Sequence, residues 1–161
     1  MPSPLCQVKR FAMLRAMATG SVYDAIKAKL TTDLGGSYAV LDWEQIDQNI
    51  AQLTVPFLTL EESDDATELM SVGSPDANWI NDSGMIDVHI FVPATGSLSA
   101  ARSIGDAVRA SLQYQYFSAA GQPGLRVLNA TQPAPGAVAD GLWHSMIVTV
   151  EYENKYAVAT A

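Results

Sequence analysis

The stretch Met85-Ile86-Asp87-Val88-His89-Ile90-Phe91-Val92-Pro93 alternates cleanly between two sets of side chains. A period of two with β-branched residues on one side is typical of a strand that lies on a core. Pro93 ends this strand, because proline has no N–H to donate to a neighbouring strand. Residues 94–97 then form a turn, and a helical pattern follows at once. We therefore predict a central strand that leads into a helix packed back over it.

Two segments have the apolar spacing of amphipathic helices. In residues 21–34 the apolar side chains recur at steps of four, and Gly35-Gly36 ends the segment. The second helix begins near Ser97 or Ser99, and its apolar stripe comprises Ile104, Val108 and Leu112. Gly105 within it costs about 1 kcal/mol relative to alanine. It therefore indicates a close approach to the first helix or the sheet, with Ala25 and Ala28 as candidate partners.

Other stretches predict further strands, over residues 38–43, 55–61, 125–131 and 142–152. Between residues 61 and 82 the chain is acidic and has no Lys or Arg. Its carboxylates are Glu61, Glu62, Asp64, Asp65, Glu68, Asp76 and Asp82. A strand over 67–72 would make this segment an acidic β-hairpin that projects from the body, and a mobile loop is the alternative.

Together these elements predict an α+β protein, a two-layer sandwich with a mixed sheet of about five strands and two helices on one face. We expect an N-terminal arm or extension over 1–20, a single domain over 21–153 and a C-terminal tail over 154–161. The face without helices would carry Met85, Phe91, Trp143 and Ile147. Apolar side chains gathered on one face often mark a partner surface, although scattered exposed ones are ordinary.

The composition limits the classes of function. Of the 161 residues, 48% are hydrophobic and 16% are charged, against roughly 25% charged in average domains. So few charges favour an oligomer, and a compact monomer with polar loops is the alternative. A net charge of −8 argues against a protein that grips phosphate backbones. No apolar run reaches the roughly 20 residues that span a bilayer, so we expect no membrane association.

No residue pattern points to catalysis. By strand alternation His89 faces away from the helices and His144 faces toward them, so the two cannot share a metal ion. Cys6 is the only cysteine and has no nearby histidine, and no G-x-S-x-G motif is present. We therefore predict no catalytic residues, no metal site and no cofactor, and we expect that the protein is not an enzyme.

Several runs, taken in order, resemble one known family. They are Ser21-Val22-Tyr23-Asp24-Ala25-Ile26, Val55-Pro56-Phe57-Leu58, Val88-His89-Ile90-Phe91-Val92-Pro93 followed by Gly96 and Ala100-Ala101-Arg102, and finally Gly141-Leu142-Trp143-His144 with Val148-Thr149-Val150-Glu151-Tyr152. Over residues 21–153 the chain resembles the tail-terminator (tail-completion) proteins of long-tailed bacteriophages. Residues 1–20 depart from that pattern.

The resemblance implies a structural virion protein that forms a homohexameric ring on the last ring of the tail tube. Such a ring ends tube polymerisation and joins the tail to the head-side connector or stopper protein, while double-stranded DNA passes through its lumen without specific binding. The protein would be located in the tail–neck region of the virion and be assembled in the host cytoplasm. Another neck component, a stopper or adaptor, stays an alternative. So does a small-ligand-binding domain or enzyme that uses Asp64, Asp65 and His89.

Within such a ring we expect two sets of contact residues. Asp64, Asp65 and Glu68 of the acidic hairpin would line the lumen or contact the tube ring. The apolar face would meet a neighbouring copy through Met85, Phe91, Trp143 and Ile147.

Overall fold

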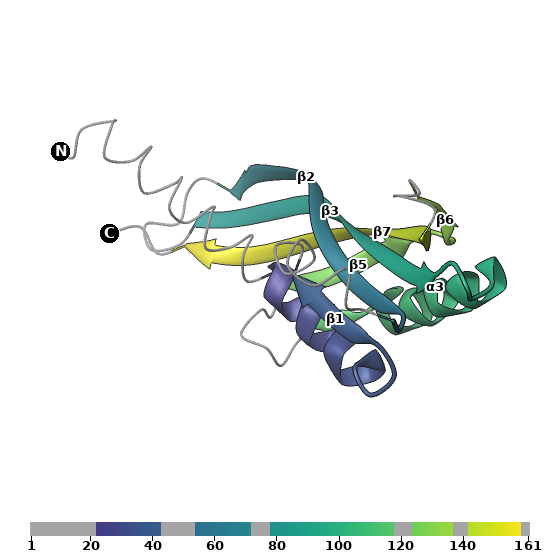
Figure 1. The fold of residues 1–161 in the computed structure, drawn as a ribbon. Coiled ribbons are helices and arrows are strands. Elements are labelled where there is room, and N and C mark those ends of the chain that lie inside the picture. The colour runs from purple at the N-terminus through teal and green to yellow at the C-terminus, as the bar shows by residue number, and fades with distance from the viewer. Residues whose placement is uncertain (1–21, 43–53, 72–77, 118–123, 137–141, 159–161) are drawn as a thin grey trace.

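The computed structural model describes residues 22–42, 54–71, 78–117, 124–136 and 142–158 (Figure 1). The predicted arm over 1–20 lies outside these residues. The described part contains a helix over residues 22–34 and a second helix, α3 (Leu98–Leu112). Its strands are β1 (Ala39–Asp42), β2 (Phe57–Ser71), β3 (Asn78–Pro93), β4 (Tyr116–Phe117), β5 (Leu125–Ala130), β6 (Ala134–Pro135) and β7 (Trp143–Val158).

The strands form one mixed, curved sheet. The order is β1-β2-β3-β7-β5-β4, and β6 pairs with β7. β1 and β2 are parallel, and the other described pairs are antiparallel. The α+β class is therefore confirmed. The five-strand sandwich is wrong, because the described sheet has seven strands and curls into a half-barrel. β4 and β6 are two residues each, too short to show an alternating pattern in the sequence.

The predicted central strand is β3, which pairs with β2 on one side and with β7 on the other. Its β-branched side chains are buried as predicted, since Val88 is 0% exposed and lies opposite Leu60 and Val148. The apolar stripes of both helices join the same core. Figure 1 shows the two helices on one side of the sheet.

Helix α3 is fixed at both ends by polar contacts. The side chain of Ser97 caps its first turn by accepting a hydrogen bond from the backbone N–H of Ala100 at 3.1 Å. Near its C-terminal end, Arg109 Nε donates to the carbonyl oxygen of Ala130 in β5 at 3.0 Å. These contacts confirm the predicted start of the helix and tie its end to the sheet.

The close approach predicted at Gly105 exists, but its partner is different. A Cβ atom at Gly105 would lie 2.5 Å from Cγ of Pro133 and 3.4 Å from Cδ1 of Ile90. The predicted partners Ala25 and Ala28 are not the nearest neighbours, and Ala28 is exposed. The glycine makes room for the segment after β5, which no spacing in the sequence reveals.

The three longest strands extend beyond the helices (Figure 1). β3 and β7 have 16 residues each, or about 50 Å at 3.3 Å per residue. The 15 residues of α3 span only about 22 Å at 1.5 Å per residue. The helices therefore cover part of the sheet. We call the rest the projection: residues 61–71 of β2, 78–85 of β3 and 151–158 of β7.

The projection confirms the strands of the predicted acidic hairpin. β2 and β3 pair antiparallel from Phe57↔Phe91 to Ser71↔Trp79, and the turn over 72–77 lies outside the described residues. β7 continues this pairing on the other side of β3, out to Asn78↔Val158. The projection is therefore a three-stranded ribbon, and β7 runs through residues that the sequence suggested as the start of a tail.

The sheet face opposite the helices has a small core of its own. Phe57 is 1% exposed; its ring stacks on Phe91 at 5.0 Å between centroids and meets Trp143 edge-on at 5.2 Å. Met85, Phe91 and Ile147 are half-buried on this face. The expected exposure of Trp143 is wrong, because its contact with Phe57 leaves it only 8% exposed.

Replacing Thr59, on the same face, should increase the stability of the protein. Its side chain is 0% exposed, and Oγ1 has no hydrogen-bond partner among the described residues. Because a buried hydroxyl without a partner costs free energy, Thr59→Val is expected to raise the free energy of unfolding by about 1 kcal/mol.

Thr149 supplies the matched control for that substitution. Its Oγ1 donates to Asp87 Oδ1 at 2.6 Å, so Thr149→Val is expected to destabilise by about 1 kcal/mol. Urea unfolding of both variants measures the two signs. Equal losses would contradict the prediction for Thr59.

Candidate functional site

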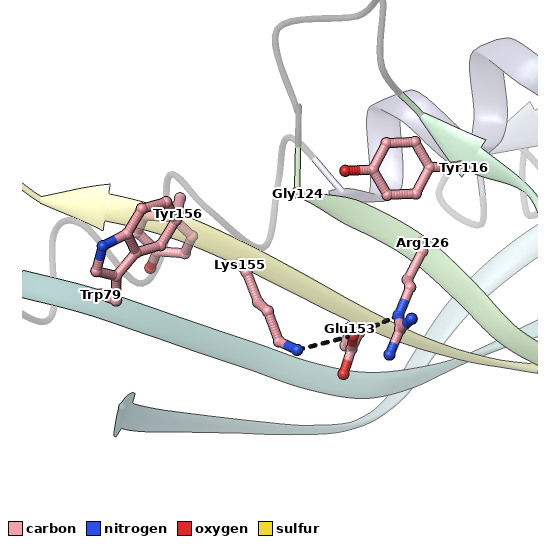
Figure 2. A pocket seen from close by; sticks show the side chains of 7 residues that line it. All are labelled: Trp79, Tyr116, Gly124, Arg126, Glu153, Lys155 and Tyr156. Carbon is pink, nitrogen blue, oxygen red and sulfur yellow. Dashed lines mark ion pairs between the residues drawn. The ribbon is translucent and has the colours of Figure 1, made fainter. Parts of the chain in front are cut away.

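A hollow of about 580 Å³ lies on the projection beside β5 (Figure 2). Four strands, β3, β4, β5 and β7, contribute to it. Its lining comprises Trp79, Tyr116, Gly124, Arg126, Glu153, Lys155 and Tyr156. Trp79 is 51% exposed and Tyr116 is 60% exposed, so two large aromatic side chains offer apolar surface here.

Strand register brings the charged side chains together. Arg126 of β5 lies opposite Glu153 of β7, and Tyr116 of β4 lies opposite Arg126. Lys155 stands two residues beyond Glu153, which places both on the same side of β7 because side chains alternate along a strand. The group therefore depends on pairing between segments that are distant in the sequence.

The three charged groups form one connected cluster. Arg126 Nε and Lys155 Nζ both donate to Oε1 of Glu153, the lysine at 3.2 Å. Burial by itself raises the pKa of the Glu153 carboxyl, but its hydrogen bonds to Arg126 and Lys155 outweigh burial and hold that pKa below its usual range. Two cations and one carboxylate leave the cluster with a net charge of +1.

These cations stand apart from the others in the described chain. Lys27 and Lys29 lie on the helix over 22–34, and Arg102 and Arg109 lie on α3. Within the strands that the structure describes, Arg126 and Lys155 are therefore the two residues with cationic side chains of the Lys or Arg type. The hollow is a small cationic surface on an otherwise acidic sheet. Its chemistry suits carboxylates, which guanidinium and ammonium groups bind through charge-assisted hydrogen bonds.

The opposite edge of the projection is acidic. Four carboxylate side chains of β2 are exposed, namely Glu61, Glu62, Asp65 and Glu68. The backbone of Asp64 belongs to this strand, and its side chain lies outside the described part. Glu61 Oε2 contacts His89 Nε2 at 3.0 Å across the strand pair.

Carboxylates of β2 and β3 also act on Tyr152, a buried residue of β7. Burial, followed by the charges of Glu62, Asp65 and Asp82, raises the pKa of Tyr152 to about 12. Burial, followed by the charge of Asp65, also raises the pKa of Glu62. No three His, Cys, Asp or Glu side chains of the described residues could hold a metal ion together. In the same part of the chain, no helix is long and apolar enough to cross a membrane.

The predicted contact residues do not form one patch. Asp65 and Glu68 lie on the outer strand of the projection, whereas Phe91 and Ile147 lie on the sheet face opposite the helices. Met85 lies on the same face at the start of the projection, and buried Trp143 lies at the other end of that face. The residues of the hollow were not predicted, because Lys155 fell in the expected tail and Arg126 meets Glu153 only through strand pairing.

Glu153 gives the site a testable dependence on pH. A carboxyl whose pKa is lowered in the folded state stabilises the fold above its unfolded pKa of about 4.3, and this contribution is lost as the pH falls through the folded pKa. Glu153→Gln is therefore expected to be less stable than wild type near neutral pH, and its stability should fall less on acidification. Urea unfolding at about pH 7 and about pH 3 measures this.

Glu151→Gln is the matched control, because Glu151 is exposed on the same strand two residues away. It should follow wild type at both pH values. A Glu153→Gln protein with the acid sensitivity of wild type would contradict the role of the cluster.

Comparison with known proteins gives little. No family model matches the chain, and no curated protein matches it. A solved structure can be aligned over 83% of this chain and 96% of its own, at 14% sequence identity and a TM-score of 0.45. A likeness this weak carries no argument about fold or function.

Proposed function

We propose that this chain is a structural virion protein that forms a homohexameric ring at the end of a phage tail tube. The ring ends tube polymerisation and joins the tail to the head-side connector, and DNA passes through its lumen. The observation that carries the proposal is the projection. It extends the sheet past its helices and presents an acidic open strand, with exposed Leu69 and Met70 near its end.

Physical reasons favour an assembly role for such a feature. An open strand edge exposes N–H and C=O groups that a further strand can satisfy, and charged side chains on it limit unspecific pairing. Exposed Leu69, Met70 and Trp79 gather near the end of the ribbon, where a partner could cover them. The order of sequence runs that resembles tail terminators supports the same role.

The charge also fits a ring around DNA. Carboxylates that face the lumen would repel the phosphate backbone and let it slide. Because screening limits this repulsion to about 8 Å at physiological salt, only side chains at the lumen wall contribute. The acidic projection, with Asp64, Asp65 and Glu68, is the element we propose for the lumen or the tube ring.

The test is replacement of Asp64, Asp65 and Glu68 by alanine in a phage that encodes this chain. Electron microscopy should show tails of irregular length or tails without heads. Plaque counts should fall at least about tenfold, because each roughly 1.4 kcal/mol of lost contact energy weakens binding between the ring and its partners about tenfold. Asp24→Ala with Asp106→Ala removes exposed carboxylates from the helices and is the control.

Deletion of the gene separates the possible neck roles. Tails of uncontrolled length are expected for a terminator. Tails of normal length that lack heads would favour a stopper. Normal virions from the triple-alanine variant would reject the proposed contact of the acidic projection.

A further inference from the structure

The two edges of the projection carry opposite charge. In the strand order β1-β2-β3-β7-β5-β4, the acidic strand β2 lies on one side of β3, and β7 and β5, which carry Lys155 and Arg126 of the hollow, lie on the other. Between Glu61 and Asp82 the chain has no Lys or Arg. One chain thus contains both halves of a complementary pair of surfaces.

Within the described part of the chain, the acidic edge also has an open backbone. β1 pairs with β2 only from Phe57 to Leu60. From Glu61 to Ser71 the outer side of β2 has no strand partner among the described residues. An open strand can add to another surface through its main-chain groups, while its side chains provide the specificity.

The hollow can receive carboxylates. A guanidinium has five N–H donors, and Arg126 uses its Nε–H on Glu153, which leaves its two NH₂ groups to approach a second carboxylate. The side chains of Arg126 and Lys155 are 50% and 40% exposed. Figure 2 shows Trp79 and Tyr116 on either side of this charged group. Aromatic and Arg side chains are the types enriched at protein interfaces.

The acidic edge and the hollow of the same copy cannot contact each other. β3 separates β2 from the strands that carry Lys155 and Arg126, and the open side of β2 faces away from β7. We propose that the hollow lined by Trp79, Tyr116, Arg126 and Lys155 docks the acidic β2 edge of a second copy of this chain. The contact is head-to-tail, and such contacts close into a ring when the rotation between copies allows it. This inference deepens the proposed ring and rests on it.

The test is an exchange of charge between the two surfaces. One variant carries Arg126→Glu with Lys155→Glu, and the other carries Glu62→Lys with Glu68→Lys. Sedimentation velocity of the full chain should show self-association for wild type, and a dissociation constant raised at least about 100-fold in either variant, since two close charge pairs worth tenfold or more each are lost. An equimolar mixture should assemble again, because each variant then meets a complementary partner.

Controls distinguish loss of this contact from loss of folding and from a change in net charge. Lys29→Glu with Arg102→Glu changes the net charge by the same amount as Arg126→Glu with Lys155→Glu, but on the helices, and should leave association unchanged. Circular dichroism must show folded variants, and restored assembly in the mixture would itself require folded chains. Higher salt should weaken the wild-type assembly.

Two results would overturn the inference. One is a wild-type chain that stays monomeric up to its solubility limit. The other is association that the charge exchange does not change. If assembly ignores the charge exchange while tails still need the protein to end at the right length, the inference fails and the proposed function stands. If the rings form as described and tails without the protein are normal, the proposed function fails.

Discussion

Val88→Asp is expected to leave the chain unfolded at 25 °C. Val88 is 0% exposed, and its neighbours across the sheet are Leu60 and Val148. A carboxylate at this position would be buried without a partner, at a cost of about 5 kcal/mol or more. Domains of this size have a total stability of only about 5–15 kcal/mol. Far-UV circular dichroism and urea titration measure the loss.

Asp87→Asn, one residue away, is the control. Asp87 lies on the opposite face of β3 and accepts a hydrogen bond from Thr149 Oγ1, which an amide oxygen can also accept. This variant should fold and lose at most about 1 kcal/mol. If Val88→Asp unfolded cooperatively in urea, with the same midpoint as wild type, β3 would not be the centre of the core.

Phe57→Ala is expected to have the second largest effect, a loss of about 3–5 kcal/mol in the free energy of unfolding. Its ring is 1% exposed and contacts both Phe91 and Trp143. Removing it would leave a cavity between two aromatic rings that backbone pairing holds apart. Urea unfolding followed by tryptophan fluorescence would report on both stability and the surroundings of Trp143.

Phe91→Ala is the companion variant. Phe91 lies opposite Phe57 on β3 and is half-buried, so part of its surface already meets solvent. It should lose less than half as much stability as Phe57→Ala. If both variants lost the same amount, the core on this face would be a simple stacked pair without a central residue.

Periodicity predicted the elements that have one clear apolar side. β3 alternates without interruption from Met85 to Pro93, and Ile104, Val108 and Leu112 are buried on α3 at helical spacing. The start of α3 could be predicted from Ser97, because serine is a preferred residue at the N-cap of a helix. The acidic segment predicts a hairpin or a mobile loop, and the pairing of β2 with β3 confirms the strands of the hairpin.

Other features depend on pairing that a single segment does not show. The register between β2 and β3 shifts between Glu62 and Asp64, so alternation breaks within one strand. Trp143 was expected to be exposed because its strand position alone does not reveal Phe57 beside it. The sequence predicts a tail from residue 154, whereas β7 continues to Val158 because it pairs with β3 as far as Asn78.

The candidate site could not be predicted from the sequence either, because it also depends on strand pairing. Arg126 and Glu153 belong to β5 and β7, and only the register of these strands makes them neighbours. Tyr116 and Trp79 join them from two further strands. A cluster built from four strands leaves no spacing motif in the chain.

The place of β7 between β3 and β5 has a consequence for biosynthesis. Of the described strands, β7 is the last to leave the ribosome, and the bond from Thr149 to Asp87 joins residues 62 positions apart. Until β7 emerges, the nascent chain can form the β2–β3 pair but cannot link it to β5. Completion of the sheet is therefore a late event, after translation of most of the polypeptide, and a chain that ends before Trp143 would lack the strand that joins β3 to β5.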